Sequence, residues 1–303
     1  MILQAENLTH LYGSRKALDG LSFSVSKGEI FGLLGPNGGG KSTLFRILAT
    51  MMSPTSGSAQ VAGFDVATHA AEVRRRIGVV FQTQSLDRKL TVEENLIAQC
   101  HLFGMSGARL KARVEECLDK MRLTDRRADV VDTLSGGLKR RVEIAKALLH
   151  EPEVLLMDEP STGLDPGVRR ELSDHMQELR AKGGVTILLT THILEEADRC
   201  DRLLLIHEGR RVAEGTPAEL KAKVGGDVVV MESEAPDGLA EKVKARFALE
   251  PHVNGNHMRV EIANGHRFIT EVIEAFPGAI QSIALHKPTL EDVFLDETGA
   301  SIS

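Results

Sequence analysis

Two hydrophobic patterns mark strands along the chain. From Leu21 to Val25, apolar side chains alternate with serines, which is the period-two pattern of a half-buried strand. Residues 30–34 form a short apolar run, as a buried strand would, and residues 154–157 form a continuous one that is typical of a strand buried on both faces of a parallel sheet. We therefore expect strands throughout residues 1–34 and a parallel sheet in the core.

Helical spacing follows the run at 30–34. The apolar residues recur at i, i+3, i+4 and i+7, which predicts an amphipathic helix containing Leu44, Ile47, Leu48 and Met51. Residues 53–82 then contain a Pro/Ser/Gly turn, short strands around Val61, and an apolar run at 77–81 that ends at Gln82.

A helical insertion is predicted at about residues 83–150. Thr91 and Glu94 have the spacing of a capping box, and the apolar face behind them comprises Val92, Leu96, Cys100 and Phe103. A second helix is expected at 109–121. A third begins at Ser135, a natural N-cap, and its buried stripe comprises Leu138, Val142, Ala145 and Leu149.

The chain beyond residue 150 predicts two further regions. Asp165 and Pro166 start a helix that ends at Gly183, and a strand at 185–191 and a hairpin around Glu208 follow. Past Gly226 the order changes to strand 227–233, helix 237–247, strands 250–253 and 257–262, helix 265–276 and strand 280–285. This β-α-β-β-α-β order predicts a small α+β domain of the ferredoxin-like type.

Composition narrows the function classes. The 303 residues are 42% hydrophobic and 26% charged, as in a soluble globular protein with one large domain or two unequal ones. No apolar run approaches the ~20 residues of a membrane span, and no secretory signal is visible. A net charge of −6 argues against nucleic acid as the main partner. The three cysteines are far apart, so we expect a reducing compartment and neither a disulfide framework nor a zinc site.

Residues 35–43 carry the strongest chemical signal. They fit G-x-x-x-x-G-K-[ST], in which glycines let backbone amides turn toward phosphate oxygens, Lys41 reaches the β- and γ-phosphates, and the Ser42 hydroxyl binds Mg²⁺. Strand, loop and helix in succession aim a helix N-terminus at an anion. The sequence thus predicts a nucleotide-phosphate site that comprises Gly35, Pro36, Asn37, Gly38, Gly39, Gly40, Lys41, Ser42 and Thr43.

Further polar residues lie at strand ends. Asp158 and Glu159 directly follow the run at 154–157, at the edge where open α/β sheets bind ligands, and His192 follows the strand at 185–191. Gly136 and Gly137 open a helix although each glycine costs about 1 kcal/mol in a helix interior. We therefore expect another group to approach that backbone closely.

In the order Gly loop, Gln82, Leu-Ser-Gly-Gly, Asp158-Glu159, Ser161–Asp165 and His192, residues 1–220 resemble the nucleotide-binding subunits of ATP-binding-cassette transporters. The guanine motif N-K-x-D of GTPases is missing. The resemblance implies an α/β P-loop NTPase domain at 1–222, with a mixed core sheet, an antiparallel β subdomain and an α-helical subdomain. Residues 223–303 would form the C-terminal accessory or regulatory domain.

The same resemblance implies an ATPase that uses ATP and Mg²⁺. Glu159 would be the general base or water-orienting residue, His192 would contact the γ-phosphate, and Tyr12 would stack on adenine. The Mg²⁺ ligands would be Ser42, Gln82 and Asp158. Lys41 and Gln82 join Glu159 and His192 in the catalytic set.

Dimerisation is implied as well. Two subunits pack head to tail in this family, so that Ser135, Gly136 and Gly137 would face the γ-phosphate held by the partner's Gly loop. A second interface loop would comprise Ser161, Gly163, Leu164 and Asp165. ATP would close the pair, formed by two copies or by this chain and a similar ATPase subunit, and hydrolysis would reset it.

Two positions depart from the family pattern. Leu138 stands where glutamine is usual, which removes a polar contact near the partner's nucleotide and should alter the affinity for closure without abolishing activity. Gly39 stands where a small residue such as alanine is usual, which should make the loop more flexible and leave its chemistry intact.

The tail indicates a branch of the family. Residues 287–295 (Lys-Pro-Thr-Leu-Glu-Asp-Val-Phe-Leu) resemble the tail of exporter ATPases of the daunorubicin-resistance type, although Thr289 and Asp292 also form a plain capping box. The resemblance implies export through a separate membrane permease, gripped by the helical insertion and the region after Gln82, on the cytoplasmic face of the cell membrane.

Two alternatives remain at this point. A soluble switch of the same ATPase type, acting in DNA repair, translation or cofactor assembly, would carry long coiled-coil or zinc insertions or a second cassette, and the chain has none of these. A degenerate, non-catalytic binding module would lack residues that are intact in this sequence, namely Lys41, Asp158, Glu159 and His192.

Overall fold

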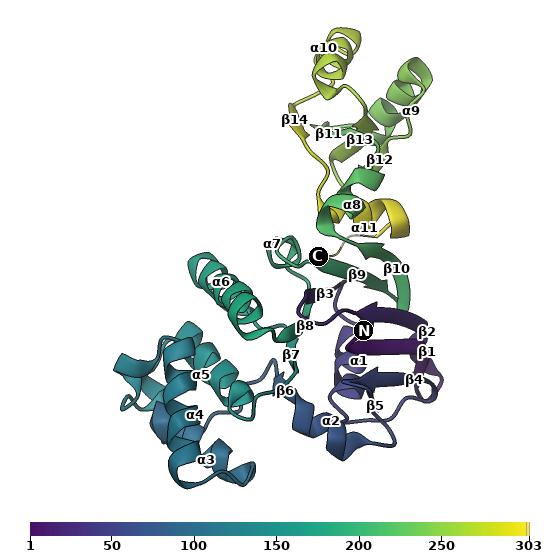
Figure 1. The fold of residues 1–303 in the computed structure, drawn as a ribbon. Helices are drawn as coiled ribbons and strands as arrows, with labels where there is room; N and C mark the ends of the chain where they lie inside the picture. Colours follow the sequence, from purple (N-terminus) through teal and green to yellow (C-terminus); the bar gives the residue numbers. More distant parts are fainter. Residues whose placement is uncertain (301, 303) are drawn as a thin grey trace. The chain divides into compact units, whose positions relative to one another are not determined.

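The computed structural model describes residues 1–300 and 302, and the chain divides after Pro217 into two compact units (Figure 1). In the first unit a four-stranded antiparallel sheet has the order β2-β1-β4-β5. Its strands are β1 (Leu3–Tyr12), β2 (Arg15–Val25), β4 (Ser56–Val61) and β5 (Phe64–Asp65). Alternate residues of β2 are buried, as the serine alternation predicted.

The core sheet of the same unit has six strands in the order β10-β9-β3-β8-β7-β6. They are β3 (Ile30–Leu34), β6 (Ile77–Val80), β7 (Val154–Asp158), β8 (Thr186–Thr191), β9 (Arg202–His207) and β10 (Arg210–Gly215). All neighbouring pairs are parallel except β9 and β10, which form the expected hairpin. Every residue of β3 and β7 is buried, so the continuous apolar runs are central strands.

Parallel pairing brings the carboxyl ends of β3, β6, β7 and β8 to one edge of the core sheet. The Gly loop follows β3, Gln82 lies two residues beyond β6, Asp158 ends β7, and His192 follows β8. The sheet therefore gathers at one edge residues that lie up to 157 positions apart in the sequence.

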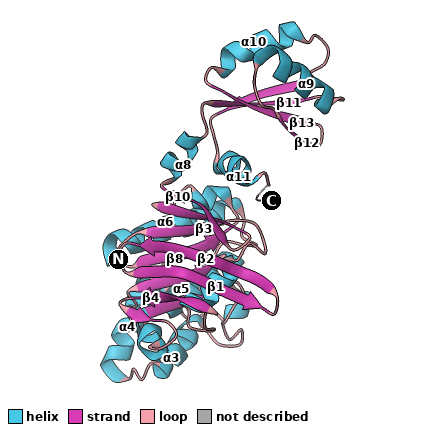
Figure 2. Ribbon diagram, turned by 90° about the vertical axis from the view of Figure 1, so that its right-hand side faces the viewer, coloured by secondary structure: helices cyan, strands magenta, loops and turns pink. Residues whose placement is uncertain are grey.

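Helices flank the sheets of the first unit (Figures 1 and 2). They are α1 (Lys41–Leu48), α2 (Ala70–Arg76), α3 (Val92–Leu102), α4 (Gly107–Lys120), α5 (Gly136–Leu148), α6 (Pro166–Gly183) and α7 (Leu194–Ala197), with 3₁₀ turns at Thr124–Arg126 and Val131–Thr133. The helices α3, α4 and α5 pack on one another, and α5 also packs against β6. They form the predicted helical insertion.

Four details of the helices differ from expectation. The first helix ends at Leu48, before Met51, whose side chain is 59% exposed. Phe103 also lies outside its helix, half exposed and stacked on His150 at 4.0 Å between ring centroids. Leu138 is only half-buried. The sequence pattern did not predict α2, because Val73 is its one buried residue.

The second unit is a βαββαβ sandwich. After α8 (Pro217–Lys223), it comprises β11 (Asp227–Glu232), α9 (Pro236–Phe247), β12 (His252–Asn254), β13 (His257–Ile262), α10 (Gly265–Ala275), β14 (Ser282–His286) and α11 (Leu290–Thr298). The antiparallel order β12-β13-β11-β14 is that of the split-βαβ, ferredoxin-like fold. The predicted bounds of the six elements from β11 to β14 agree with the observed ones to within two residues.

Two features hold this second unit together. Residues of β11, β13, α9 and α10 form an apolar core that includes Val229, Met258 and Phe268. Asp292 closes the capping box of α11 with Thr289 and also lies 2.9 Å from the buried Arg259 guanidinium of β13. The capping box predicted in the tail is therefore present, and it also ties α11 to the sheet.

The described part of the chain contains no helix with the length and apolar composition needed to cross a bilayer.

Candidate active site

The Gly loop turns tightly between β3 and α1. A Cβ atom on Gly35 would lie 2.2 Å from the Ile206 carbonyl oxygen, and a Cβ on Gly40, whose φ is +106°, would lie 2.6 Å from the Ala17 carbonyl oxygen. Backbone therefore passes too close at both positions for any side chain. These contacts explain why two of the fixed motif positions must be glycine in this fold.

Lys41 is 3% exposed and lies against the loop that it follows. Its Nζ donates hydrogen bonds to the Gly35 carbonyl at 2.6 Å and to the Pro36 carbonyl at 3.0 Å. Burial lowers the pKa of Lys41, and the nearby carboxylates of Glu159 and Asp158 oppose that shift. The ammonium is thus held inside the concave face of the loop.

Asp158 is the last residue of β7 and is almost fully buried. The Thr190 hydroxyl of the neighbouring strand donates to its Oδ1 at 2.6 Å. Burial raises the pKa of Asp158, and the Thr190 hydrogen bond partly counters that rise. A carboxylate destabilised in this way gains from a cation placed beside it.

The carboxylate of Glu159 lies at the centre of the side-chain contacts in this site. Gln82 donates to its Oε2 from 3.1 Å, and the Thr162 hydroxyl donates to the same oxygen from 3.2 Å. Its Oε1 lies 3.3 Å from His192 Nδ1 and 3.9 Å from Lys41 Nζ. Glu159 therefore contacts Lys41, Gln82 and His192, three residues that were predicted from separate motifs.

The backbone of Glu159 is left-handed, with φ of +44°. Only a few per cent of residues other than glycine adopt this region, and such strain often marks a functional position. The Glu159 amide donates to both the carbonyl and the hydroxyl of Thr190, at 3.1 and 3.0 Å. Thr190 thus holds the strained turn and Asp158 together.

A cavity of about 240 Å³ opens over the Gly loop. Tyr12, whose side chain is 46% exposed, lines it beside Lys41 and Glu159. Arg15 and Arg46 line it too, and the sequence reasoning missed both. Their charges make the cavity more favourable for an anion.

The Ser135–Gly137 segment lies elsewhere. Ser135 caps α5, as predicted, by accepting a hydrogen bond from the Leu138 amide. Ser135 and Gly136 are exposed, whereas Gly137 is buried. None of the three residues is among the described residues that line the cavity over the Gly loop. A Cβ on Gly137 would lie 2.4 Å from Val168 Cγ1 in α6, so glycine allows α5 and α6 to pack closely.

The loop predicted as a second interface, Ser161–Asp165, lies beside that helix start. Leu164 Cδ2 would be 3.3 Å from a Cβ on Gly136, and Gly163 has φ of +77°. Ser161 is buried, whereas Gly163 and Asp165 are exposed. Asp165 occupies the N-cap position of α6, as predicted.

The turn between β9 and β10 supports the Gly loop from behind. Glu208 and Gly209 both have positive φ, +49° and +75°, as in a two-residue hairpin turn. The Gly209 amide donates to the Gly39 carbonyl at 2.9 Å, and its carbonyl accepts from the Asp19 amide at 3.0 Å. This turn therefore joins the loop to β2.

The residues present fit a magnesium nucleotide. The donors at the sheet edge are the Ser42 hydroxyl, the Gln82 amide oxygen and the Asp158 carboxylate, hard oxygen ligands of the type that Mg²⁺ prefers. The loop offers a cradle that only glycines can form, with a buried ammonium inside it. Such a site can stabilise charge on transferring phosphoryl groups.

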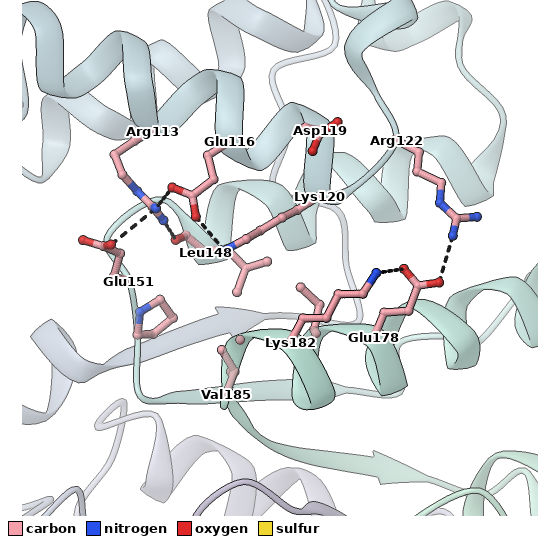
Figure 3. Close-up of a pocket in the computed structure, with 13 residues that line it drawn as sticks. Arg113, Glu116, Asp119, Lys120, Arg122, Leu148, Glu151, Glu178, Lys182 and Val185 are labelled. Carbon is pink, nitrogen blue, oxygen red and sulfur yellow. Dashed lines mark hydrogen bonds and ion pairs between the residues drawn. The ribbon is translucent and has the colours of Figure 1, made fainter.

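A larger cavity, of about 500 Å³, lies between α4 and α6 (Figure 3). Most of its charged side chains pair with one another: Lys120 lies 2.7 Å from Glu116, and Arg122 of the helical region lies 2.8 Å from Glu178 of α6. Because these charges already have partners, we assign the nucleotide to the smaller cavity.

Comparison with known proteins agrees with this geometry. A family model described as ABC transporter matches residues 18–162, and one described as the C-terminal domain of DrrA1-3-like ATP-binding proteins matches residues 215–298. The Nod factor export ATP-binding protein I of Paraburkholderia xenovorans (strain LB400) is 43% identical over 98% of this chain and 97% of its own length. The daunorubicin resistance ATP-binding protein DrrA3 of Streptomyces coeruleorubidus is 40% identical over 95% of this chain and 93% of its own.

Solved structures are similar as well. The structure of cbiO1 from Clostridium perfringens, part of the ABC transporter complex cbiONQ, has a TM-score of 0.69 and 29% identity and covers 82% of this chain and 96% of its own. A dimeric post-hydrolysis state of the ATP-binding cassette MJ0796 with ADP and Pi has a TM-score of 0.63 and 30% identity and covers 71% of this chain and 98% of its own.

Proposed function

The chain belongs to the ATP-binding-cassette transporter family as an ATP-hydrolysing subunit of its exporter branch, and from this premise we propose that two copies close head to tail over ATP and drive a separate membrane permease. One observation carries the proposal. The Glu159 carboxylate contacts Gln82, His192 and Lys41 beside the Gly loop, so that the candidate base, sensor and phosphate-binding groups form one cluster.

Each residue of the cluster has a role in this proposal. Glu159 orients the attacking water and accepts its proton, and His192 holds that geometry from the end of β8. Lys41 exchanges its two loop carbonyls for phosphate oxygens. Tyr12, at the mouth of the cavity, stacks on adenine.

Ser42, Gln82 and Asp158 would hold Mg²⁺. When bound, the ion supplies positive charge that stabilises the transferring phosphoryl group. Thr190 prepares Asp158 for this role by fixing the orientation of the carboxylate.

The exposed start of α5 supports the head-to-tail pair. Ser135, Gly136 and Gly137 present a helix N-terminus outside the chain's own cavity, and such a terminus favours an anion. In the pair it faces the γ-phosphate on the partner's Gly loop, with the loop Ser161, Gly163, Leu164 and Asp165 beside it.

The proposal also covers the contact with the permease and the roles of the two domains. We propose that α3–α5 and the segment after Gln82 bind the permease on the cytoplasmic face, because the similar relatives are named as ATP-binding proteins of export and drug resistance. Residues 1–222 act as the ATPase domain, and residues 223–303 act as an accessory or regulatory domain.

The test uses the full chain with Glu159→Gln, which should bind ATP but fail to turn it over. ATP should convert this variant from monomer to dimer in size-exclusion chromatography with light scattering. Adding Ser135→Arg should abolish the dimer but leave binding of a fluorescent ATP analogue intact, whereas Lys41→Ala should abolish binding. Normal ATP hydrolysis by the single variant Ser135→Arg would contradict the head-to-tail pair.

A further inference from the structure

Side chains on one face of α5 bind the segment that follows β6. Arg140, Glu143 and Lys146 are spaced three residues apart along the helix, so their side chains project from neighbouring turns. All three point their polar groups at residues 81–85, a stretch that has no helix or strand of its own.

The contacts are specific to backbone atoms. The Arg140 guanidinium donates to the Phe81 carbonyl at 2.7 Å and to the Gln82 carbonyl at 3.3 Å. The Ser85 amide donates to the Glu143 carboxylate at 2.7 Å, and Lys146 donates to the Ser85 carbonyl at 2.8 Å. The main chain on both sides of the Gln82 side chain is therefore fixed by one helix.

Arg140 and Glu143 also bind each other, at 2.8 Å between Nη1 and Oε2. Their side chains are buried, with relative exposures of 5% and 3%. Burial lowers the pKa of Arg140 and raises the pKa of Glu143, so water exclusion disfavours both charges. A buried ion pair of this kind adds little to stability compared with apolar residues, and its best-attested use is to fix one arrangement.

The geometry also requires an arginine. Its planar fork reaches two adjacent carbonyls and a carboxylate at once, which the single ammonium of a lysine cannot do in the same way. The Gln82 side chain in turn donates to Glu159 Oε2 at 3.1 Å. A contact chain thus runs from α5 through the Gln82 backbone to the candidate base.

We propose that Arg140 and Glu143 are positioning residues that set where Gln82 meets Glu159. This inference rests on the proposed function, in which Glu159 is the base and the N-terminus of α5 faces the partner's nucleotide. Closure of the pair at Ser135–Gly137 then moves the same helix that holds Gln82. In consequence, ATP bound at the partner's Gly loop changes, through α5, how Gln82 meets Glu159 in this subunit.

The experiment is a double-mutant cycle in the full chain, using single-turnover ATP hydrolysis with Mg²⁺. Arg140→Lys should lower the hydrolysis rate roughly 10- to 100-fold, because misplacing a catalytic contact by about 1 Å can cost that much. Affinity for a fluorescent ATP analogue should change less than about twofold. In a Gln82→Ala background, Arg140→Lys should have no further effect, since it acts through the side chain that is already missing.

Arg141 provides a matched control. It lies next to Arg140 on α5 but pairs with Glu171 of α6 at 2.5 Å, away from residues 81–85. Any effect of Arg141→Lys on the rate should be the same with Gln or Ala at position 82. If Arg140→Lys fails to fold, Glu143→Gln replaces it, because the change is isosteric, removes the charge that pairs with Arg140 and keeps an oxygen that can accept from the Ser85 amide.

The outcomes separate the two proposals. Equal effects of Arg140→Lys in both backgrounds, or loss of nucleotide affinity, would overturn the positioning role and leave the proposed function standing. Wild-type hydrolysis by Gln82→Ala would instead overturn the role of Gln82 in the proposed function, and the positioning role with it.

Discussion

Replacing Thr190 by valine tests whether the sheet edge prepares Asp158 for a cation. Valine keeps the shape of threonine but removes the hydroxyl that donates to Asp158 at 2.6 Å and accepts from the Glu159 amide at 3.0 Å. The amide keeps its bond to the Thr190 carbonyl at 3.1 Å, so the main loss is the hydrogen bond to the carboxylate.

The magnitude follows from that bond. A buried hydrogen bond to a charged group contributes about 1.5–3 kcal/mol, against about 1 kcal/mol for a neutral one. Thr190 is fully buried, so solvent cannot replace the lost donor. We expect the variant to lose about 1.5–3 kcal/mol of unfolding free energy at pH 8.

The sign of the pH dependence is fixed by the pKa of Asp158. Burial raises this pKa, and Thr190→Val removes an interaction that lowers it, so the pKa rises further. When a carboxyl has a higher pKa in the folded state than in the unfolded state, the protein loses stability as pH rises from the unfolded to the folded pKa. The loss of unfolding free energy in the variant should therefore grow as pH rises. It should shrink by about 1 kcal/mol once Asp158 is protonated.

Urea unfolding of both proteins from pH 8 down to about pH 4, close to the ordinary aspartate pKa of 3.8, measures this deficit in unfolding free energy. Thr186→Val is the matched control, because Thr186 lies on the same face of β8, is fully buried, and accepts from the Gly28 amide at 3.0 Å, a hydrogen bond that involves no carboxylate. A deficit that is equal at all pH values for Thr190→Val, as expected for Thr186→Val, would refute the reasoning.

Three further predictions follow from single contacts. Glu159→Gln should lower ATP hydrolysis roughly 10²- to 10⁴-fold in a phosphate-release assay while an ATP analogue still binds, and near-normal turnover would contradict its role as base. Gly137→Ala should lower the thermal midpoint by the equivalent of about 1–3 kcal/mol because its Cβ would overlap Val168, whereas Gly136→Ala should not. Burial raises the pKa of Cys117 to about 11, and all three thiols are buried, so iodoacetamide at pH 8 should label none of them until the protein is unfolded, as counted by mass spectrometry.

Much of the fold was predictable because its signals are local. Continuous apolar runs marked β3 and β7, and Ser135 marked the start of α5. The six elements from β11 to β14 were predicted within two residues at each bound, since turn residues such as Gly226, Gly255 and Pro277 separate them. The signal failed where burial is weak: α2 buries only Val73, and Met51 has helical spacing but lies beyond the helix end.

The candidate site divides in the same way. Motif residues such as Lys41 and Glu159 could be named because their residue types and spacing are specific to phosphate chemistry. Their supports could not, because Arg140 reaches Phe81 across 59 residues and Thr190 reaches Asp158 across 32. Thr190 and Thr191, which end β8 directly before His192, were the one local indication of these supports. Hydroxyls at the end of a buried strand can therefore be interpreted as supports for a neighbouring site.

The hairpin turn at Glu208–Gly209 decides how far a working nucleotide-binding fragment must extend. A fragment that stops after His192 keeps every motif residue from Tyr12 onward, yet it loses β9 beside β3 and the amide that binds the Gly39 carbonyl. The Gly loop would then lose the hydrogen bond that supports it from β9–β10, and β3 would become an exposed edge strand. The shortest self-sufficient piece of this ATPase therefore ends with β10, after Gly215, more than twenty residues beyond its last motif.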